Sequence, residues 1–219
     1  ADLSSKADIH RLSEEIHSKF DSLDVLLNNA GAIFMKRIET VDGLEMTFAL
    51  NHLNYFMLTS LLLDLLKNGS KPRIVNVSSG AHFGGRINFS DLQIKEKYSG
   101  WRAYSASKLM NILFTYELDR RLKKENSFIT VNALHPGFVA TNFGKSNGGL
   151  LQPIFGITQL AAIKPEEGAK TSIYLASSPD VENISGKYFA NCAETRSSPG
   201  SYDNQAALKL WQASELLAN

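Results

Sequence analysis

Short runs of apolar and β-branched residues recur along the chain, and helix-like segments separate them. The runs lie at 23–27, 73–79, 129–135 and about 186–191. Each has the length and composition of a strand buried inside a sheet. Strands that alternate with helices form βαβ units, whose strands are parallel and whose crossovers are right-handed. The sequence therefore predicts an α/β fold, a doubly wound parallel sheet with helices on both faces.

The segments between the strands carry the periodicity and the end signals of helices. The first has an apolar stripe from Ile9 to Phe20, behind Ser4 or Ser5 as its N-cap. Further helices are expected at about 41–67 and 104–124, from Pro165 to near Ser177, and around 208–217. We find no internal repeat and no linker, so residues 1–219 are expected to form one domain.

Composition limits the classes of function. The chain has 219 residues, 43% of them hydrophobic, enough to bury one sizeable core in a soluble protein. Its 23 Lys and Arg balance 22 Asp and Glu, and the basic run 120–124 suits a solvated helix end, so no nucleic-acid surface is expected. No apolar run reaches the length of a membrane span, and the five histidines lack metal-ligand spacing. Cys192 is expected to be a buried structural thiol in a reducing, cytoplasmic compartment.

Small and polar residues follow three of the predicted strands at the point where each one ends. Asn28-Asn29-Ala30-Gly31 follows the first, Ser78-Ser79-Gly80 the second, and His135-Pro136-Gly137 the third, with Thr141 four residues further on. Ligands bind outside the carboxyl ends of the strands in open parallel sheets. These segments are therefore expected to contribute to one site.

Tyr104 and Lys108 lie four residues apart in the stretch Tyr104-Ser105-Ala106-Ser107-Lys108, so a helix places them on one face. A phenol has a pKa of about 10, and a cation at about 4 Å favours the phenolate by roughly 4 kcal/mol. We therefore expect Lys108 to lower the pKa of Tyr104 toward neutrality, where general acid–base catalysis is effective. An exposed pair on a helix surface is the simpler alternative when this motif stands alone.

With these motifs the chain resembles the short-chain dehydrogenase/reductase family. The matching motifs are Asn28-Asn29-Ala30-Gly31, Asn51 in Leu50-Asn51-His52-Leu53, Val77-Ser78-Ser79, Tyr104 to Lys108, and Pro136-Gly137 with Thr141. Within the family it is most similar to the retinol-dehydrogenase-like branch, in Asp42-Gly43-Leu44-Glu45, Arg73 to Ser79, Ser107 to Asn111, and Lys209-Leu210-Trp211. The resemblance runs from Asp2 to about Leu217. It implies a Rossmann-like fold and an NAD(P)-dependent oxidoreductase that interconverts an alcohol and an aldehyde or ketone.

The resemblance assigns catalytic roles to Asn51, Ser79, Tyr104 and Lys108. It implies that Tyr104 donates a proton to the carbonyl oxygen during reduction, or accepts one during oxidation, while Ser79 hydrogen-bonds that oxygen. It gives Lys108 a contact with the nicotinamide ribose, and Asn51 a water that links Lys108 to solvent. The cofactor-binding residues that it implies are Asp2, Leu3, Asn28, Ala30, Gly31, Tyr104, Lys108, Pro136, Gly137 and Thr141.

Two features depart from the family pattern. Asn54 stands where members commonly have Gly, three places after Asn51. The glycine-rich turn that receives the pyrophosphate has no counterpart in the sequence, so the first strands of the fold are absent from it. We expect the native protein to carry several tens of additional N-terminal residues, which could include an anchor. We expect residues 1–219 expressed alone to bind NAD(P)H weakly or not at all, and to be poorly soluble.

Two segments are expected to set the substrate preference. Residues 80–101 follow Ser79 and carry His82 and Phe83, and residues 143–160 form an apolar loop that includes Leu151 and Phe155. An apolar lid favours a small lipophilic, retinol-like alcohol or carbonyl compound. Alternatively, these residues pack on the protein itself or on the partner subunit of a homodimer.

The resemblance also favours NADP(H) over NAD(H), although the residues that read the 2′-phosphate belong to the absent part. A competing hypothesis from another class is a non-catalytic fragment or pseudoenzyme that acts as a binding or regulatory protein. The missing glycine-rich turn favours that hypothesis. The presence of Asn51, Ser79, Tyr104 and Lys108 favours the enzyme.

Overall fold

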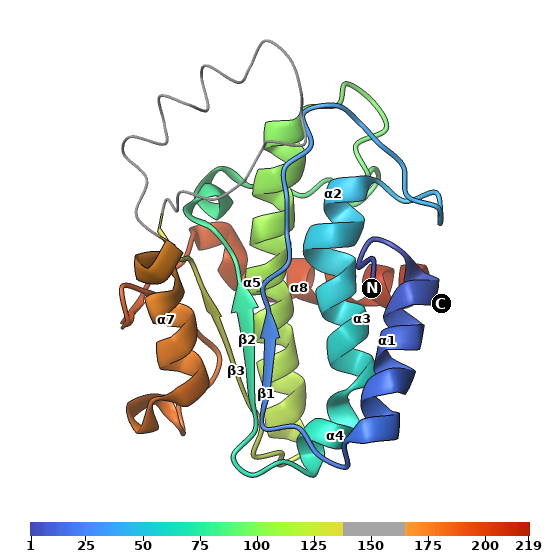
Figure 1. Ribbon diagram of the computed structural model, residues 1–219. Helices are drawn as coiled ribbons and strands as arrows, with labels where there is room; N and C mark the ends of the chain where they lie inside the picture. Colours follow the sequence, from blue (N-terminus) through green and yellow to red (C-terminus); the bar gives the residue numbers. More distant parts are fainter. Residues whose placement is uncertain (138–164) are drawn as a thin grey trace.

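The chain folds around a five-stranded sheet, as a computed structural model shows for residues 1–137 and 165–219, the part that the structure describes (Figure 1). The strands lie across the sheet in chain order: β1 (Val25–Asn28), β2 (Arg73–Val77), β3 (Thr130–Leu134), β4 (Lys187–Ala190) and β5 (Ala193–Thr195). β1 to β4 are parallel, and β5 is antiparallel to β4. The predicted α/β fold is confirmed, and only the short β5 was not predicted among these strands.

Helices cover both faces of this sheet. They are α1 (Lys6–Lys19), α2 (Met46–Phe48), α3 (Asn54–Leu61), α4 (Leu63–Lys67), α5 (Gly100–Lys124), α7 (Pro165–Ser177) and α8 (Asn204–Ala218). α7 lies on one face, and α3 and α5 lie on the other, where α1 packs against α3 and α8 against α5 (Figure 1). The first helix has Ser5 as its N-cap, as predicted.

Side chains of β2 alternate between two hydrophobic cores. Ile74 packs with Tyr55 of α3 and Phe114 of α5, whereas Val75 and Val77 pack on the α7 side. All five residues of β2 are buried, as expected for a central parallel strand with helices on both faces. The carboxyl end of β2 is therefore held in the middle of the molecule.

The segment predicted as one helix over 41–67 is broken in the structure. The Glu45 carboxylate caps α2 by accepting hydrogen bonds from the backbone N–H of Thr47 (2.9 Å) and Phe48 (2.7 Å). The chain then widens into a π-helical turn, η1 (Ala49–Leu53), before α3, and it breaks again at Leu62. π-helical turns are frequent at functional sites, and this one holds Asn51.

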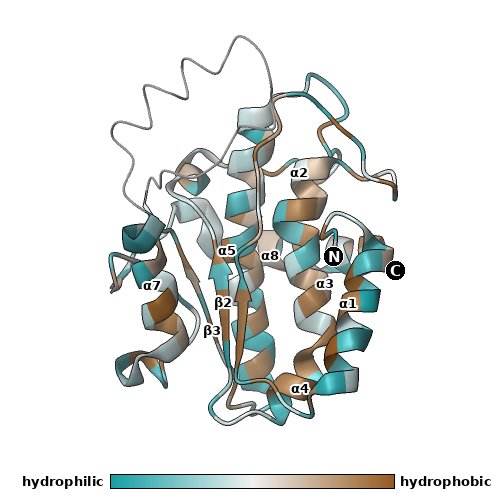
Figure 2. Cartoon of the chain, viewed as in Figure 1, coloured by the Kyte–Doolittle hydropathy of each residue, from teal (hydrophilic) through white to brown (hydrophobic). Residues whose placement is uncertain are grey.

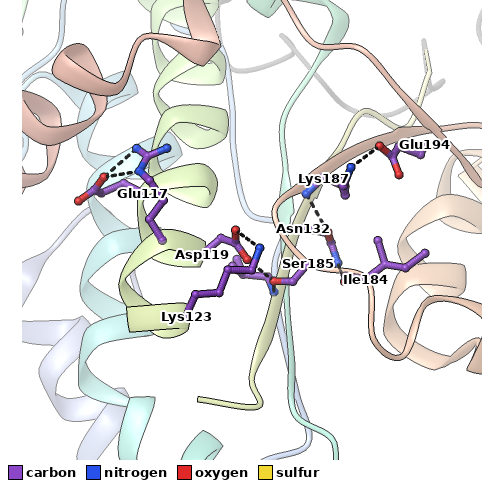
Figure 3. Close-up of polar contacts among 10 residues, drawn as sticks. Glu117, Asp119, Lys123, Asn132, Ile184, Ser185, Lys187 and Glu194 are labelled. Atoms are coloured by element: carbon purple, nitrogen blue, oxygen red, sulfur yellow. Dashed lines mark hydrogen bonds and ion pairs between the residues drawn. The ribbon is translucent and has the colours of Figure 1, made fainter. Parts of the chain in front are cut away.

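Acidic side chains of α5 pair with the basic run at its end, which was predicted to be solvated. Arg121 binds Glu117 at 2.8 Å, and Lys123 binds Asp119 at 2.7 Å. Asp119 also accepts a hydrogen bond from Ser185, just before β4 (2.6 Å; Figure 3). The end of α5 is thus tied to the chain that enters β4.

The turn between β4 and β5 contains the cysteine. Asn191 and Cys192 have positive φ angles of 51° and 59°, as a tight two-residue hairpin turn requires. The thiol of Cys192 is only half-buried and lies 3.9 Å from the Thr171 hydroxyl. The prediction of a buried thiol is wrong because the residue forms this turn rather than part of the core.

β1 lies at one edge of the sheet and is apolar up to its last residue, Asn28 (Figure 2). Its Val25 and Leu27 pair in register with Arg73 and Val75 of β2, so both side chains point to the face that α7 covers. They nevertheless remain 40% and 42% exposed. Among the described residues, α7 therefore leaves the β1 end of this face open.

Candidate active site

The carboxyl ends of the parallel strands meet at one edge of the sheet, shown at the top in Figure 1. The small and polar residues 29–31 follow Asn28 at the end of β1, Ser78 and Ser79 follow β2, and residues 135–137 follow β3. α5 packs against β2 and β3 and brings Tyr104 and Lys108 to the same edge. The strand-end segments and the Tyr–Lys pair are thus brought together as the sequence predicted.

Ser79 begins a tight loop at the end of β2. Its side chain caps a 3-10 turn, η2 (Gly80–Gly84), by accepting a hydrogen bond from the backbone N–H of Ala81 (3.2 Å). The preceding Ser78 is buried and donates to the Lys108 carbonyl (2.7 Å). The Ser79 hydroxyl remains half-buried and hydrogen-bonds the Tyr104 side chain. A hydroxyl pair is thus formed between β2 and α5.

Tyr104 is nearly buried, with 7% of its surface exposed, and its ring lies 5.9 Å from that of Trp101. Burial raises the pKa of Tyr104 above its ordinary value of 10, while the hydrogen bond with Ser79 opposes this effect. This overturns the expectation that Lys108 would bring the pKa down toward neutrality. The physical reason is that the protein interior disfavours the phenolate.

Lys108 is buried in the same interior. Its Nζ donates to the Val77 carbonyl (3.1 Å) and lies 5.8 Å from the ring centres of Tyr55 and Tyr104. Burial lowers the pKa of Lys108 from 10.5 to about 8. The ammonium therefore lies near the face of the Tyr104 ring and is itself destabilised, which limits how far it can favour the phenolate.

Asn51 fixes the segment that follows β1. Its amide oxygen accepts from the backbone N–H of Ala32 (2.8 Å), and its amide nitrogen donates to the Ala32 carbonyl (2.9 Å) and to Ser107 (3.0 Å). A Cβ on Gly31 would lie 3.1 Å from the Asn51 oxygen and 3.2 Å from Lys108 Nζ. Glycine therefore keeps the space beside the ammonium free, and the water assigned to Asn51 stays a prediction.

The other predicted cofactor residues lie in different environments. The Asn28 amide nitrogen is buried and donates to Asn76 (2.8 Å) and Thr59 (3.1 Å), so it ties β1 to β2 and α3. Asp2 accepts hydrogen bonds from Ser4. The remaining described members of the set are Leu3, which packs on the core, half-buried Ala30 and Pro136, and exposed Gly137 at φ 84°. Thr141 lies outside the described residues.

His82 and Phe83 were expected to touch substrate. His82 is fully buried and both of its ring nitrogens are hydrogen-bonded within the protein, so the expectation is overturned for this residue. Phe83 is 61% exposed, and Trp101 is 57% exposed. Leu151 and Phe155 lie outside the described residues.

Sequence reasoning missed a buried polar network behind the site. Asn111 donates to the Val77 carbonyl (3.3 Å), and its amide oxygen lies 3.4 Å from His52, whose other nitrogen contacts Ser214 of α8 (3.0 Å). Burial lowers the pKa of His52 to about 4. Polar residues inside apolar helical runs were the sequence signal for this network.

Asn54, which departs from the family pattern, is buried, and its amide makes no hydrogen bond among the described residues.

In the part of the chain that the structure describes, no group of three or more His, Cys, Asp or Glu side chains could hold a metal ion. Within the same residues, no helix has the length and apolar character needed to cross a membrane.

Comparison with known proteins finds a matching family, related sequences and a similar solved structure. A model of the short chain dehydrogenase family matches residues 1–149. Retinol dehydrogenase 14 of Homo sapiens is 48% identical over 99% of this chain, and polyprenol dehydrogenase of Homo sapiens is 39% identical over 97% of it. The chain spans 65% and 66% of the lengths of these relatives. A crystal structure of an uncharacterized protein from Mycobacterium paratuberculosis matches with a TM-score of 0.79 and 35% identity, over 99% of this chain and 73% of that chain.

Proposed function

The chain belongs to the short-chain dehydrogenase family, and we propose that it is an oxidoreductase that interconverts an alcohol and an aldehyde or ketone with a nicotinamide cofactor. The observation that carries this proposal is the Ser79–Tyr104 hydroxyl pair, which lies at the strand ends beside the buried Lys108. A proton donor and a second hydrogen-bonding hydroxyl are the groups that carbonyl reduction needs at the substrate oxygen.

The fit of a nicotinamide cofactor rests on Lys108 and Gly31. An ammonium has three N–H donors, and among the described residues only the Val77 carbonyl accepts from this one. Gly31 has no side chain, so the space beside the Lys108 ammonium that a Cβ would fill stays open. Both features suit the ribose hydroxyls of a dinucleotide. We propose NADP(H), held by the set of cofactor residues that the family resemblance implies.

The bound cofactor would supply or remove the hydride, and the chain would handle the proton. During reduction the Tyr104 hydroxyl would donate its proton to the carbonyl oxygen, and during oxidation it would accept one. Ser79 would donate a hydrogen bond to the same oxygen as negative charge develops there. Because burial raises the pKa of Tyr104, the hydroxyl carries its proton at neutral pH, as a proton donor must. Lys108 would orient the cofactor and stabilise the phenolate left after proton transfer.

We propose that the substrate is a lipophilic, retinol-like or isoprenoid alcohol or its carbonyl form. Phe83 and Trp101 present exposed aromatic rings on the segments that carry Ser79 and Tyr104. Aromatic rings at a site entrance favour apolar substrates. The relatives named above act, by their names, on retinol and polyprenol, which supports the same class. The apolar segment 143–160 lies outside the described residues.

The test is NADPH-dependent reduction of all-trans-retinal by the full-length protein, with a short polar aldehyde as the comparison substrate. We expect turnover of retinal and a much lower kcat/KM for the polar aldehyde. NADPH binding without turnover of either compound would instead favour the non-catalytic alternative. A preference for the polar aldehyde would refute the substrate class alone.

A further inference from the structure

His82 lies three residues after Ser79, in the 3-10 turn η2, and none of its surface is exposed. Its Nδ1 lies 2.7 Å from the Ser79 carbonyl oxygen, and its Nε2 lies 2.9 Å from the backbone nitrogen of Ser198. A carbonyl can only accept and a backbone N–H can only donate. Both bonds therefore exist together only in the neutral tautomer that carries its proton on Nδ1.

The segment that His82 reaches is itself fixed to α5. The neighbouring Ser197 hydroxyl lies 2.8 Å from the Tyr116 hydroxyl and 2.6 Å from that of Ser201. Tyr116 is on the same helix as Tyr104, so the contacts form a closed circuit. It runs from Ser79 through His82 to the 197–201 segment and back to the helix that carries the proton donor.

Two aromatic side chains pack against the His82 ring. The ring lies 4.3 Å from that of Phe83 and 4.9 Å from that of Tyr188. The turn also ends against α5, because a Cβ on Gly85 would lie 2.6 Å from the Ser105 carbonyl oxygen. The backbone after Ser79 is thus fixed within the turn by His82 and at the end of the turn by Gly85.

We propose that His82 is a positioning residue for the Ser79 hydroxyl, which it holds against Tyr104 through its hydrogen bond to the Ser79 carbonyl. This inference rests on the proposed function. His82 touches neither substrate nor cofactor in this role. The Nδ1–H bond to Ser79 sets the geometry, and the Nε2 bond to Ser198 holds the ring in the tautomer that can form it. A displacement of about 1 Å at a reacting group can reduce a rate by about 100-fold.

Two substitutions separate the two bonds of the ring. In His82→Asn the amide nitrogen occupies the position of Nδ1 and can still donate to Ser79. In His82→Gln the amide reaches the position of Nε2, and the donor to Ser79 is lost. We expect His82→Gln to lower kcat by about 10- to 100-fold with little change in KM, and His82→Asn to lower it by less than about 3-fold. The same pair of substitutions at the surface residue His17 serves as the control and should leave kcat unchanged.

A double-mutant cycle shows whether His82 affects kcat through Ser79. If His82 acts through Ser79, His82→Gln should cause no further loss of kcat when Ser79 is already replaced by Ala. An equal loss in the Ser79→Ala background, or equal losses in the Asn and Gln variants, would overturn the proposal.

A measurement without turnover keeps this inference separate from the proposed function. The ¹⁵N chemical shifts of the His82 imidazole in the wild-type protein report which nitrogen carries the proton. We expect a neutral ring protonated on Nδ1 near pH 7, whether or not the protein reduces retinal. A ring protonated on Nε2, or an imidazolium, would overturn the inference even if the enzyme is active. Absence of turnover with the expected tautomer would refute the proposed function and, with it, the positioning role.

Discussion

Replacement of Lys108 by Met should stabilise the fold near pH 7 while it removes the proposed activity. The side chain is fully buried, and burial lowers its pKa from 10.5 to about 8. This difference corresponds to about 3 kcal/mol of destabilisation by the charge, because each pKa unit is worth about 1.4 kcal/mol. Met has a similar shape without the charge, but it loses the hydrogen bond to the Val77 carbonyl, worth about 1 kcal/mol. We therefore expect Lys108→Met to be more stable than the wild type by about 2 kcal/mol.

The pH dependence of this difference has a defined sign. Below about pH 8 the lysine is protonated in both the folded and the unfolded protein, so the wild type carries the full destabilisation. Between about pH 8 and pH 10.5 the unfolded chain binds more protons than the folded one, so the wild type gains stability as the pH rises. Above this window both forms are neutral, and the wild type should be the more stable by about 1 kcal/mol, the value of its hydrogen bond.

Urea-induced unfolding, followed by circular dichroism, measures this difference directly. The wild type and Lys108→Met are compared near pH 7 and at intervals up to about pH 10.5, so that all other titrating groups cancel. A variant less stable than the wild type near pH 7 would show that the ammonium is stabilised where it lies. A stability difference that does not change with pH would show that its pKa is not lowered.

Three further substitutions test the proposed cofactor site, the proposed apolar substrate contact and the exposed edge strand. Gly31→Ala should weaken NADPH binding by about 10-fold or more, because its Cβ would crowd Lys108; fluorescence titration checks this, and unchanged affinity would remove Gly31 from the cofactor site. Trp101→Asp should flatten the rise of kcat/KM with aldehyde chain length, which is worth up to about 0.8 kcal/mol per buried methylene; a dependence as steep as in the wild type would place the apolar contact elsewhere. Leu27→Lys should raise the solubility of residues 1–219, because it puts a charge on an exposed apolar edge strand; aggregation equal to that of the wild type in light scattering would contradict this role of β1.

Local sequence patterns were sufficient to predict much of the fold. The helix from Pro165 to Ser177 was predicted with both of its ends, because a proline at the start and acidic residues in the first turn are local signals. The central strands were found because both faces are buried and their apolar runs are continuous. The π-helical turn was missed because nothing local marks it. The Asn51 side chain that it carries is fixed by Ala32, a contact distant in sequence.

Contacts between residues distant in sequence also explain the errors in the predicted site. The buried state of His82 depends on Ser198, which is 116 residues away in the sequence, so spacing near Ser79 could not reveal it. The pKa of Tyr104 was expected to fall because Lys108 is four residues away on the helix. Its direction is set by burial, which arises from packing of the whole chain and is not encoded in the spacing of two residues.

Single-turnover reduction of all-trans-retinal with NADPH, in the full-length wild-type protein and in Tyr104→Phe, tests the central claim most directly. The variant keeps the buried ring and loses only the hydroxyl, so its fold, checked by circular dichroism, should be unchanged. General acid catalysis contributes about 100- to 10,000-fold, and we predict a loss of the chemical step in this range. A single-turnover rate in Tyr104→Phe within a few-fold of the wild-type rate would contradict the assignment of Tyr104 as the proton donor.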